Sequence, residues 1–520
     1  MVAEASISRP SVREQTAPLM IESAANAVRI CSILKAARAF RCPKNTSSSC
    51  EVAYENAFQA GCNGGLLSPP LRSTRFRSLT AGRSTDSRRA IRTARGRPTG
   101  YSGLGWRSPA NSYKMLRRMN SVVSDKPYVP VLPYHGTLWG RALNLYIPRY
   151  LHRRYGVTKV EIFGAEKLRS SIAAGHGVLI TPNHCRDEDP FVLSRLASEV
   201  GKLFFVVASA HLFMGSKLQA FLLRRAGAFS IYREGMDKQA VQTSIEILES
   251  AERPLVIFPE GHISRTNDRL TPMLEGTALI ARQAAKKRAK ENKKVVVHPV
   301  ALHYSFPFDV ESAAARMLDE IETRLTWRPS RGLPLHERLP KVGAGLLALK
   351  ELEYLGHTQE GTIPQRIDKL IDAILKPMEA EWTNGNGEGH TVARVKRLRA
   401  AILPDMIKGE LDEAEKARRW RLLEDADLAQ QLYHYPPNYI TDGAPKGRII
   451  ETIERFEEDL TGKVTVHGPV EAKITVGDAI EVSTARESRG EADPLMAAIE
   501  NQLRTMLGIA QESPAGAAAP

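Results

Sequence analysis

His184 and Asp189 are the residues whose types and spacing point most directly to chemistry. They lie in residues 181–191, which read TPNHCRDEDPF, after the apolar run 177–180. A histidine can accept a proton at one ring nitrogen while a carboxylate holds the other, so the pair has the composition of a general base and its orienting acid. His184 is the only one of the 13 histidines with an aspartate five positions later. Chance spacing, with Asp189 near a helix start, is the structural alternative.

Two further segments combine an apolar run with polar residues at its end. Residues 227–233 end in Arg233, and arginine is the side chain suited to hold a phosphate by two hydrogen bonds. Residues 256–265 begin as a buried strand and continue with Glu260 and Gly261. Open α/β sheets bind ligands at the carboxyl ends of their strands, and a glycine lets the backbone approach a ligand closely.

A fourth segment, residues 295–302, reads VVVHPVAL and predicts another buried strand. Pro299 in its middle lacks a backbone N–H, which predicts an edge strand or a bulge.

Together the four segments resemble the glycerolipid acyltransferase family, whose best-known members are the 1-acylglycerol-3-phosphate acyltransferases of the PlsC type. The resemblance rests on Asn-His-x4-Asp-Pro, Gly-x3-Ile-x-Arg, Phe-Pro-Glu-Gly and Pro-Val-Ala, in that order, and covers about residues 126–310. It implies transfer of a fatty acyl group from acyl-CoA or acyl carrier protein to the hydroxyl of a lysophospholipid or glycerol phosphate, above all 1-acylglycerol 3-phosphate, in phospholipid biosynthesis.

The resemblance also implies residue roles. His184 would be the general base and Asp189 would fix its orientation. Glu260 and Gly261 would help to form the acceptor site, and Arg233 would face the acceptor phosphate. The family resemblance implies neither a metal ion nor a prosthetic group as cofactor.

One segment departs from the family pattern. Family members usually continue Phe-Pro-Glu-Gly with Thr-Arg-Ser, whereas this chain has His262, Ile263 and Ser264, so that Ile263 takes the arginine position. Either Arg265 or Arg269 serves the phosphate from a reshaped loop, or the acceptor is not a phosphate ester. A catalytically silent lipid-binding protein of the same fold is the further alternative.

Cys185 suggests a rival mechanism in which a cysteine forms an acyl-enzyme. Adjacent residues in an extended segment point apart, so His184 is poorly placed to activate Cys185. The chain also lacks the Gly-x-Ser-x-Gly motif of a serine nucleophile.

The elements that must position these residues alternate in type. Strands are predicted at 159–163, 178–181, 203–208, 254–258 and 295–302, and helices at 191–201, 216–226, 237–251 and 277–290. The alternation predicts an α/β fold, and the resemblance implies a mixed sheet flanked by helices in an acyltransferase domain at 119–310. Residues 311–510 are expected to be mostly helical, with a short hairpin formed by 463–466 and 472–482, and 511–520 to be a loose tail.

Residues 138–155 mix aromatic and basic side chains at helical spacing. The segment is typical of a helix in the headgroup zone of a bilayer, and equally of an amphipathic helix that packs on the core with a solvated basic face. No apolar run reaches the ~18 residues of a spanning helix. We therefore expect a peripheral protein on the cytoplasmic face of a membrane. Its expected partners are the lipid surface, the acyl donor and the lysophospholipid acceptor, with no specific nucleic acid.

Charge divides the chain into two parts. Residues 1–118 hold 20 Lys and Arg against 6 Asp and Glu, which leaves 53 of the 73 basic and 52 of the 58 acidic residues for the rest. The basic arm is too poor in apolar residues to offset its ordering entropy, so we predict disorder. It is interpreted as a tail that touches nucleic acid or anionic lipid, as a targeting segment, or as sequence upstream of a true start near Met115 or Met119. The abrupt change of composition at Met119 favours the last interpretation.

Overall fold

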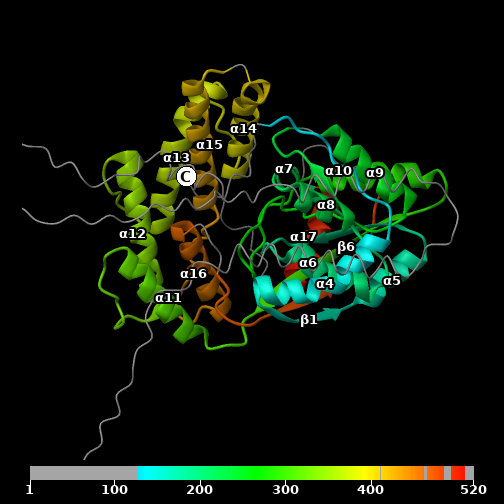
Figure 1. The fold of residues 1–520 in the computed structure, drawn as a ribbon, viewed down its shortest axis with the longest axis horizontal. Helices are drawn as coiled ribbons and strands as arrows, with labels where there is room; N and C mark the ends of the chain where they lie inside the picture. Colours follow the sequence, from blue (N-terminus) through cyan, green and yellow to red (C-terminus); the bar gives the residue numbers. More distant parts are fainter. Residues whose placement is uncertain (1–125, 236, 410, 462–464, 485–492, 510–520) are drawn as a thin grey trace, which may run out of the picture. The chain divides into compact units, whose positions relative to one another are not determined.

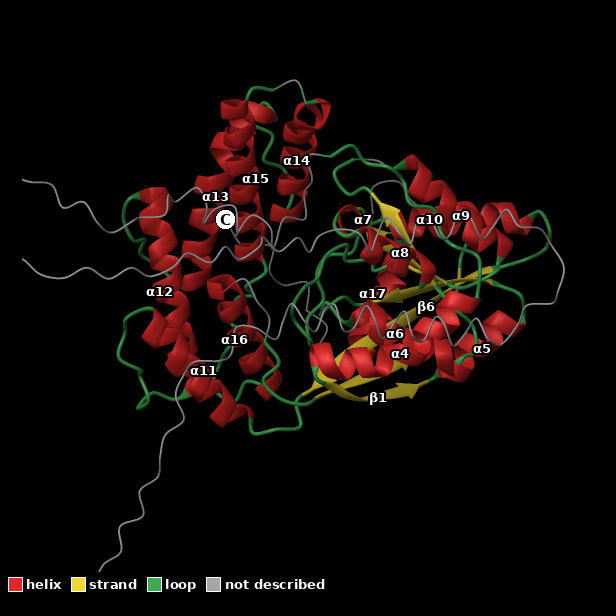
Figure 2. Ribbon diagram, viewed as in Figure 1, coloured by secondary structure: helices red, strands yellow, loops and turns green. Residues whose placement is uncertain are grey.

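A computed structural model describes residues 126–509, apart from residues 236, 410, 462–464 and 485–492. The basic arm predicted at 1–118 and the tail predicted at 511–520 lie outside the described residues. The described residues form a mixed α/β layer and a helical region (Figures 1 and 2).

The strands of the described residues form one mixed sheet in the order β1-β7-β6-β2-β5-β3-β4, with β8 beside β6. Strands β6, β2, β5, β3 and β4 run parallel to one another. Strand β7 is parallel to β1 and antiparallel to β6. The strands are β1 (Val157–Phe163), β2 (Gly177–Pro182), β3 (Phe205–Ser209), β4 (Ala228–Ile231), β5 (Leu255–Val256), β6 (Val295–Ser305), β7 (Val470–Val476) and β8 (Ile480–Glu481).

Helices cover both faces of this sheet (Figure 2). Along β2, Val178 and Ile180 belong to the core under α4, α5 and α6, whereas Leu179 belongs to the core under α9, α10 and α17. A strand buried on both faces needs a continuous apolar run, which is what residues 177–180 supply. The helices of the layer are α4 (Leu138–Tyr155), α5 (Ala165–Ala173), α6 (Asp189–Glu199), α7 (His211–Met214), α8 (Lys217–Arg225), α9 (Lys238–Ser250), α10 (Gly276–Ala289) and α17 (Pro494–Leu507).

The helical region follows β6 in the chain. One of its cores joins α12, α13, α14 and α15, and a second joins α11, α12 and α16. Ile449, Ile453 and Phe456 lie on the buried face of α16, as their spacing predicts. The helices are α11 (Val310–Arg324), α12 (Leu335–Leu355), α13 (Ile363–Trp382), α14 (Thr391–Lys408), α15 (Glu413–Tyr433) and α16 (Lys446–Thr461).

The predicted α/β fold with flanking helices and a helical C-terminal region is confirmed. The five predicted strands correspond to β1, β2, β3, β5 and β6, and the apolar part of residues 227–233 is β4. Strand β5 contains only Leu255 and Val256, because the chain leaves the ladder before the predicted end at Phe258.

The predicted hairpin at 463–466 and 472–482 is wrong. Residues 463 and 464 lie outside the described residues, and Thr465 and Val466 are not in a strand. Strand β7 instead lies between β1 and β6, and β8 pairs with another part of β6. The apolar alternation of residues 470–476 signalled a strand correctly, but the partners of a strand are set by tertiary packing rather than by local sequence.

The prediction of an edge strand or bulge at Pro299 is also corrected. Strand β6 lies inside the sheet, with β2 on one side and both β7 and β8 on the other. Val296 and Val297 pair with β8, and pairing with β7 begins at Val300. Pro299 falls in the gap between the two partners, and its carbonyl accepts a hydrogen bond from the backbone N–H of Gly477 at 2.8 Å. A residue without an N–H fits an interior strand where the partner changes.

Helix α4 has two different sides. Leu151 is buried against the core, and the helix contacts α6 and β1. Leu138 and Leu145 are 70% and 86% exposed. The helix therefore packs on the core and still presents apolar side chains outward. Among the described residues, no helix combines the length and the apolar character needed to cross a bilayer.

Candidate active site

The polar segments of the sequence meet at one edge of the sheet. His184 follows β2, Glu260 follows β5, and Arg233 follows β4. These strands are parallel and belong to the same run, β2-β5-β3-β4, so their carboxyl ends open at the same edge. This edge is where open α/β sheets bind their ligands.

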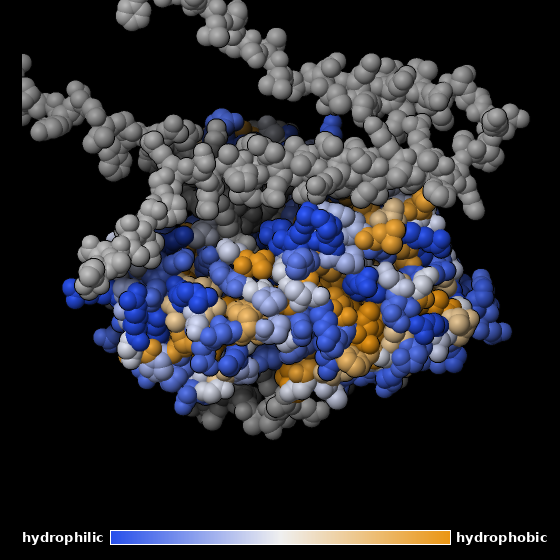
Figure 3. Space-filling view, turned by 60° about the horizontal axis from the view of Figure 1, so that its bottom comes forward, coloured by the Kyte–Doolittle hydropathy of each residue, from blue (hydrophilic) through white to orange (hydrophobic). Residues whose placement is uncertain are grey.

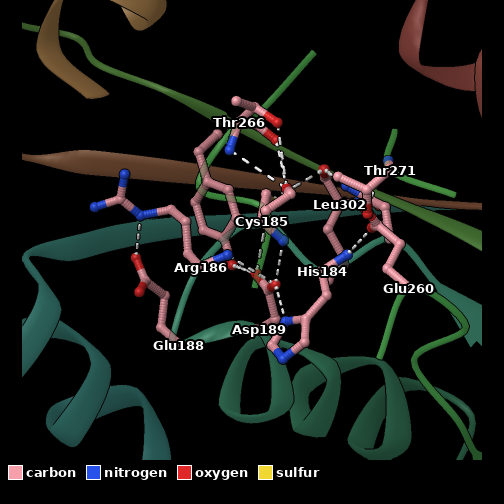
Figure 4. Close-up of polar contacts among 12 residues, drawn as sticks. His184, Cys185, Arg186, Glu188, Asp189, Glu260, Thr266, Thr271 and Leu302 are labelled. Carbon is pink, nitrogen blue, oxygen red and sulfur yellow. Dashed lines mark hydrogen bonds and ion pairs between the residues drawn. The ribbon is translucent and has the colours of Figure 1, made fainter. Parts of the chain in front are cut away.

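The central contact joins His184 to Asp189 (Figure 4). The Nδ1 atom of His184 lies 2.9 Å from Oδ2 of Asp189. An ionised carboxylate can only accept a hydrogen bond, so Nδ1 carries the proton and the Nε2 lone pair points away from Asp189. The pair therefore has the geometry of a general base held by an acid.

Asp189 is held rigidly by neutral donors. It is fully buried at the first residue of α6. Its Oδ2 also accepts the backbone N–H groups of Cys185 at 2.8 Å and Arg186 at 2.9 Å. Its Oδ1 accepts the hydroxyl of Tyr304 at 2.6 Å. Asp189 therefore does lie at the start of a helix, as the structural alternative predicts. Its carboxylate nevertheless points back to His184.

The ring of His184 is fixed on its face as well as at its edge. It stacks on Phe258, with 4.0 Å between ring centroids and 29° between the planes. The side chain keeps 11% of its surface exposed. A nearly buried base with one free nitrogen can take a proton from a hydroxyl that enters the site.

Glu260 does not present a free carboxylate. Its Oε1 accepts the backbone N–H of His184 at 2.7 Å, and its Oε2 accepts the backbone N–H of Thr271 at 2.9 Å together with the Thr271 hydroxyl. Burial raises the pKa of Glu260, although the hydrogen bonds from Thr271 and His184 act in the opposite direction. Glu260 thus ties the loop after β5 to the backbone of the histidine.

Gly261 is required by backbone geometry. Its φ is +71°, and a Cβ at this position would lie 2.4 Å from Cδ1 of Leu274. The tight turn that follows brings the N–H of Ser264 to the carbonyl of His184 at 2.8 Å. Backbone bonding thus places residues 260–264 beside the histidine.

Arg233 lies beyond β4 at the same edge and is partly buried. Burial lowers the pKa of Arg233, with a further contribution from the nearby cation Arg399 and an opposing one from Glu234. Among the described residues, no hydrogen bond links Arg233 to His184.

Arg265 and Arg269, the alternatives proposed for the phosphate, have other neighbours. Arg265 forms an ion pair with Glu458 of α16 at 2.8 Å and a longer one with Asp187 at 3.8 Å. Arg269 lies over the ring of Tyr439, 5.3 Å from its centroid. Both side chains therefore face the helical region.

Cys185 is buried, and its surroundings disfavour the reactive thiolate form. The Sγ atom lies 3.8 Å from Oδ1 of Asp189 and 3.9 Å from the carbonyl of Leu302. Burial raises the pKa of Cys185 well above its ordinary value, and the nearby carboxylate of Asp189 adds to this. A thiol held in its protonated form is a poor nucleophile.

The structure adds three supporting residues that sequence reasoning missed, namely Phe258, Thr271 and Tyr304. Tyr304 lies near the end of β6. The side-chain amide of Asn267 donates a hydrogen bond to the backbone carbonyl of Tyr304 and accepts one from its backbone N–H. Only the alternation along residues 295–305 could have indicated that Tyr304 points to the same side of the sheet as Leu302. Nothing in the sequence indicates that Thr271 donates hydrogen bonds to the carboxylate of Glu260.

The donor set offers no evident metal site. Within the described ranges, no group of three or more His, Cys, Asp or Glu side chains is arranged to hold a metal ion.

Comparison with known proteins identifies the part of the chain that carries this geometry. A search of curated proteins found no match. Residues 159–303 match the protein-family model described as Acyltransferase, and this range contains β1 to β6 except for the first two residues of β1 and the last two of β6. Residues 159–303 therefore form an acyltransferase domain of the PlsC type, the glycerolipid acyltransferase kind.

Proposed function

We propose that the chain transfers a fatty acyl group from acyl-CoA or acyl carrier protein to the hydroxyl of a lysophospholipid or glycerol phosphate. The preferred acceptor is 1-acylglycerol 3-phosphate, and the reaction belongs to phospholipid biosynthesis. The observation that carries the proposal is the 2.9 Å contact between His184 Nδ1 and the buried Asp189 carboxylate inside the acyltransferase domain.

The proposed reaction needs no covalent enzyme intermediate. The Nε2 atom of His184 takes the proton of the acceptor hydroxyl as its oxygen attacks the thioester carbonyl. When the carbon–sulfur bond breaks, the imidazolium returns the proton to the departing thiolate. Asp189 stabilises the imidazolium between the two steps, and holding both substrates together makes the reaction effectively unimolecular.

Glu260 and Gly261 act in this proposal by shaping the acceptor site. The hydrogen bond from the His184 backbone to Glu260 fixes the distance between the histidine and the loop after β5. Arg233 faces the acceptor phosphate from the end of β4.

We also propose that α4 rests on the cytoplasmic face of a membrane. The exposed leucines Leu138 and Leu145 lie on a helix that also exposes Arg149 and Arg153. Apolar side chains flanked by cations suit the boundary between acyl chains and anionic headgroups. Figure 3, which turns the lower edge of Figure 1 forward, shows apolar patches between hydrophilic ones on this side of the molecule.

A substrate screen tests the proposed reaction. Purified protein is incubated with acyl-CoA or acyl carrier protein thioester, in the presence of lysophospholipids, glycerol phosphate and neutral monoacylglycerol. We expect a new ester on a phosphate-bearing acceptor and release of one free thiol per ester. Binding of lysolipid without thiol release, under every donor and acceptor combination, would instead identify a silent lipid-binding protein.

A further inference from the structure

We propose that Glu454 of α16 is a positioning residue for the catalytic pair, which it holds in place through Arg186. Helix α16 belongs to the helical region and lies outside the matched residues 159–303. The inference rests on the proposed function, because the pair to be positioned is the base and the acid of the acyl transfer. It makes the helical region part of the catalytic arrangement.

Arg186 supports both carboxylate oxygens of Asp189. Its backbone N–H donates at 2.9 Å to Oδ2, the same atom that contacts Nδ1 of His184. Its guanidinium lies over the ring of Tyr304, 5.6 Å from the centroid, and the Tyr304 hydroxyl donates to Oδ1. Figure 4 shows this guanidinium bonded to Glu188 and pointing away from His184. Arg186 can therefore orient the acid without touching a substrate.

Two carboxylates hold the guanidinium of Arg186. Its Nε donates to Glu188 at 2.6 Å, and its Nη1 donates to Glu454 at 3.1 Å. Although burial opposes it, the charges of Glu454 and Glu188 raise the pKa of Arg186 well above its ordinary value. Arg186 and Glu454 each keep 13% of their side-chain surface exposed, so solvent screens the pair only weakly. Glu188 would move with its own loop, whereas Glu454 ties that loop to a separate helix.

A second link runs from α16 to the other member of the catalytic pair. Arg455, the residue after Glu454, donates at 3.0 Å to the carbonyl of Ser264. The backbone N–H of Ser264 donates to the carbonyl of His184 at 2.8 Å. Two consecutive residues of α16 therefore reach the acid and the base, each through one intermediate residue.

Charged contacts, rather than apolar packing, join α16 to the catalytic loops. Arg448 pairs with Asp268 at 2.7 Å, and Glu458 pairs with Arg265 at 2.8 Å. The apolar face of α16 packs on α11 and α12 instead. A pocket lined by residues 185–188 and by residues of α16 lies between the loop after β2 and this helix. The ion pairs therefore set the distance between α16 and the loop.

The test compares Glu454→Gln with Glu457→Gln in the full chain. Glu457 is the matched control, because it lies on the same helix with 20% of its side chain exposed and pairs with His467 at 2.7 Å. Glu454→Gln keeps the size of the side chain but loses the charge that anchors Arg186. We expect kcat to fall roughly 10-fold with little change in either KM, since displaced catalytic groups slow the chemical step. Glu457→Gln should retain the kcat of the unmodified protein.

A double variant tests whether Glu454 acts through Arg186. Arg186→Gln leaves the backbone N–H in place, so its effect on kcat comes from the lost guanidinium. If the two residues act as a unit, Arg186→Gln combined with Glu454→Gln should have nearly the kcat of Arg186→Gln alone. A loss equal to the product of the two single losses would contradict action through Arg186.

Hydrogen exchange at the backbone N–H groups of residues 184–186 gives a measure that does not depend on turnover. These groups donate to Glu260 and Asp189. Exchange should be roughly 5-fold faster or more in Glu454→Gln, because the loop opens more often, and unchanged in Glu457→Gln.

Three outcomes would overturn the inference: an unchanged kcat in Glu454→Gln, an equal loss of kcat in Glu457→Gln, or unchanged exchange in Glu454→Gln. Faster exchange in Glu454→Gln, combined with no turnover by the unmodified protein for any donor and acceptor, would support the positioning and contradict only the proposed function.

Discussion

Two buried glutamates show how differently the two regions of the molecule treat a carboxylate. Glu260 at the catalytic edge is 1% exposed and accepts hydrogen bonds only from neutral groups of His184 and Thr271. Glu351 in the helical region is fully buried and accepts two bonds of 2.8 Å from the guanidinium of Arg366. Burial raises the pKa of Glu260, whereas the hydrogen bond from Arg366 lowers that of Glu351.

The different hydrogen-bond partners of these carboxylates fit different roles for the two regions. An arginine neutralises Glu351 and locks α12 to α13, which serves stability alone. Asp189 and Glu260 are held by backbone N–H groups and hydroxyls, which fix position without cancelling charge. A carboxylate that keeps its charge can stabilise an imidazolium that forms next to it, and one that is paired with an arginine cannot do so as well.

Replacing the orienting acid should give the largest effect on turnover. Asp189→Asn keeps the size of the side chain but removes the charge that stabilises the imidazolium. We expect kcat to fall by roughly 10²–10⁴-fold, the usual contribution of general base catalysis. Steady-state acyl transfer measures it. His303→Gln on the same sheet should retain normal turnover, and a fully active Asp189→Asn protein would remove Asp189 from the mechanism.

Replacing Glu260 tests whether its hydrogen bonds from neutral donors position His184 for catalysis. In Glu260→Gln, one terminal oxygen becomes an NH₂ group that must face either the His184 N–H or the Thr271 N–H. Loss of one hydrogen bond to a charged group costs ~1.5–3 kcal/mol, so kcat should fall by roughly 10–150-fold if the loss appears in positioning. The measurement is kcat together with the thermal midpoint. A fall in the midpoint with unchanged kcat would limit Glu260 to a structural role.

Replacing Glu351 should give the opposite result. Glu351→Gln leaves Arg366 without its charged partner, so the free energy of unfolding should fall by ~1.5–3 kcal/mol while kcat stays unchanged. Because the folded-state pKa of Glu351 is lowered, its contribution is present above pH 4.5 and is lost as the pH falls below that value. Urea unfolding at pH 7 and pH 4 measures this. An equal difference between variant and unmodified protein at both pH values would contradict the ion-pair account.

The smallest expected effect concerns the membrane. Leu145→Glu should weaken binding to anionic phospholipid vesicles by ~10-fold, because a leucine at the interface contributes ~1.5 kcal/mol, the lower end of the range for full burial. Vesicle sedimentation measures it. Leu349→Glu on α12 is the matched control, since Leu349 is an exposed leucine of the helical region. Equal binding by the two variants would show that α4 does not contact the lipid.

The sequence was sufficient for the parts of the fold that local patterns determine. The apolar runs at 177–180 and 295–302 gave β2 and β6, and the five-residue spacing of His184 and Asp189 gave the central hydrogen bond. In both cases the residues that form the feature are close in sequence, either within one strand or a few positions apart.

What the sequence left open depends on long-range packing. No local signal shows that residues 470–476 enter the sheet between β1 and β6, some 165 residues after β6 ends. The same holds for Tyr304 on Asp189 and for His434 on His262, whose partners are distant in the chain. The family resemblance implies that Glu260 helps to form the acceptor site, and only the structure shows that the protein itself occupies both of its carboxylate oxygens.

The most direct test of the account is single-turnover acyl transfer by His184→Ala, with saturating thioester donor and a phosphate-bearing acceptor. The account predicts a folded protein whose rate constant for ester formation falls by roughly 10²–10⁴-fold. Ester formation at the unmodified rate in this variant would contradict proton removal by His184.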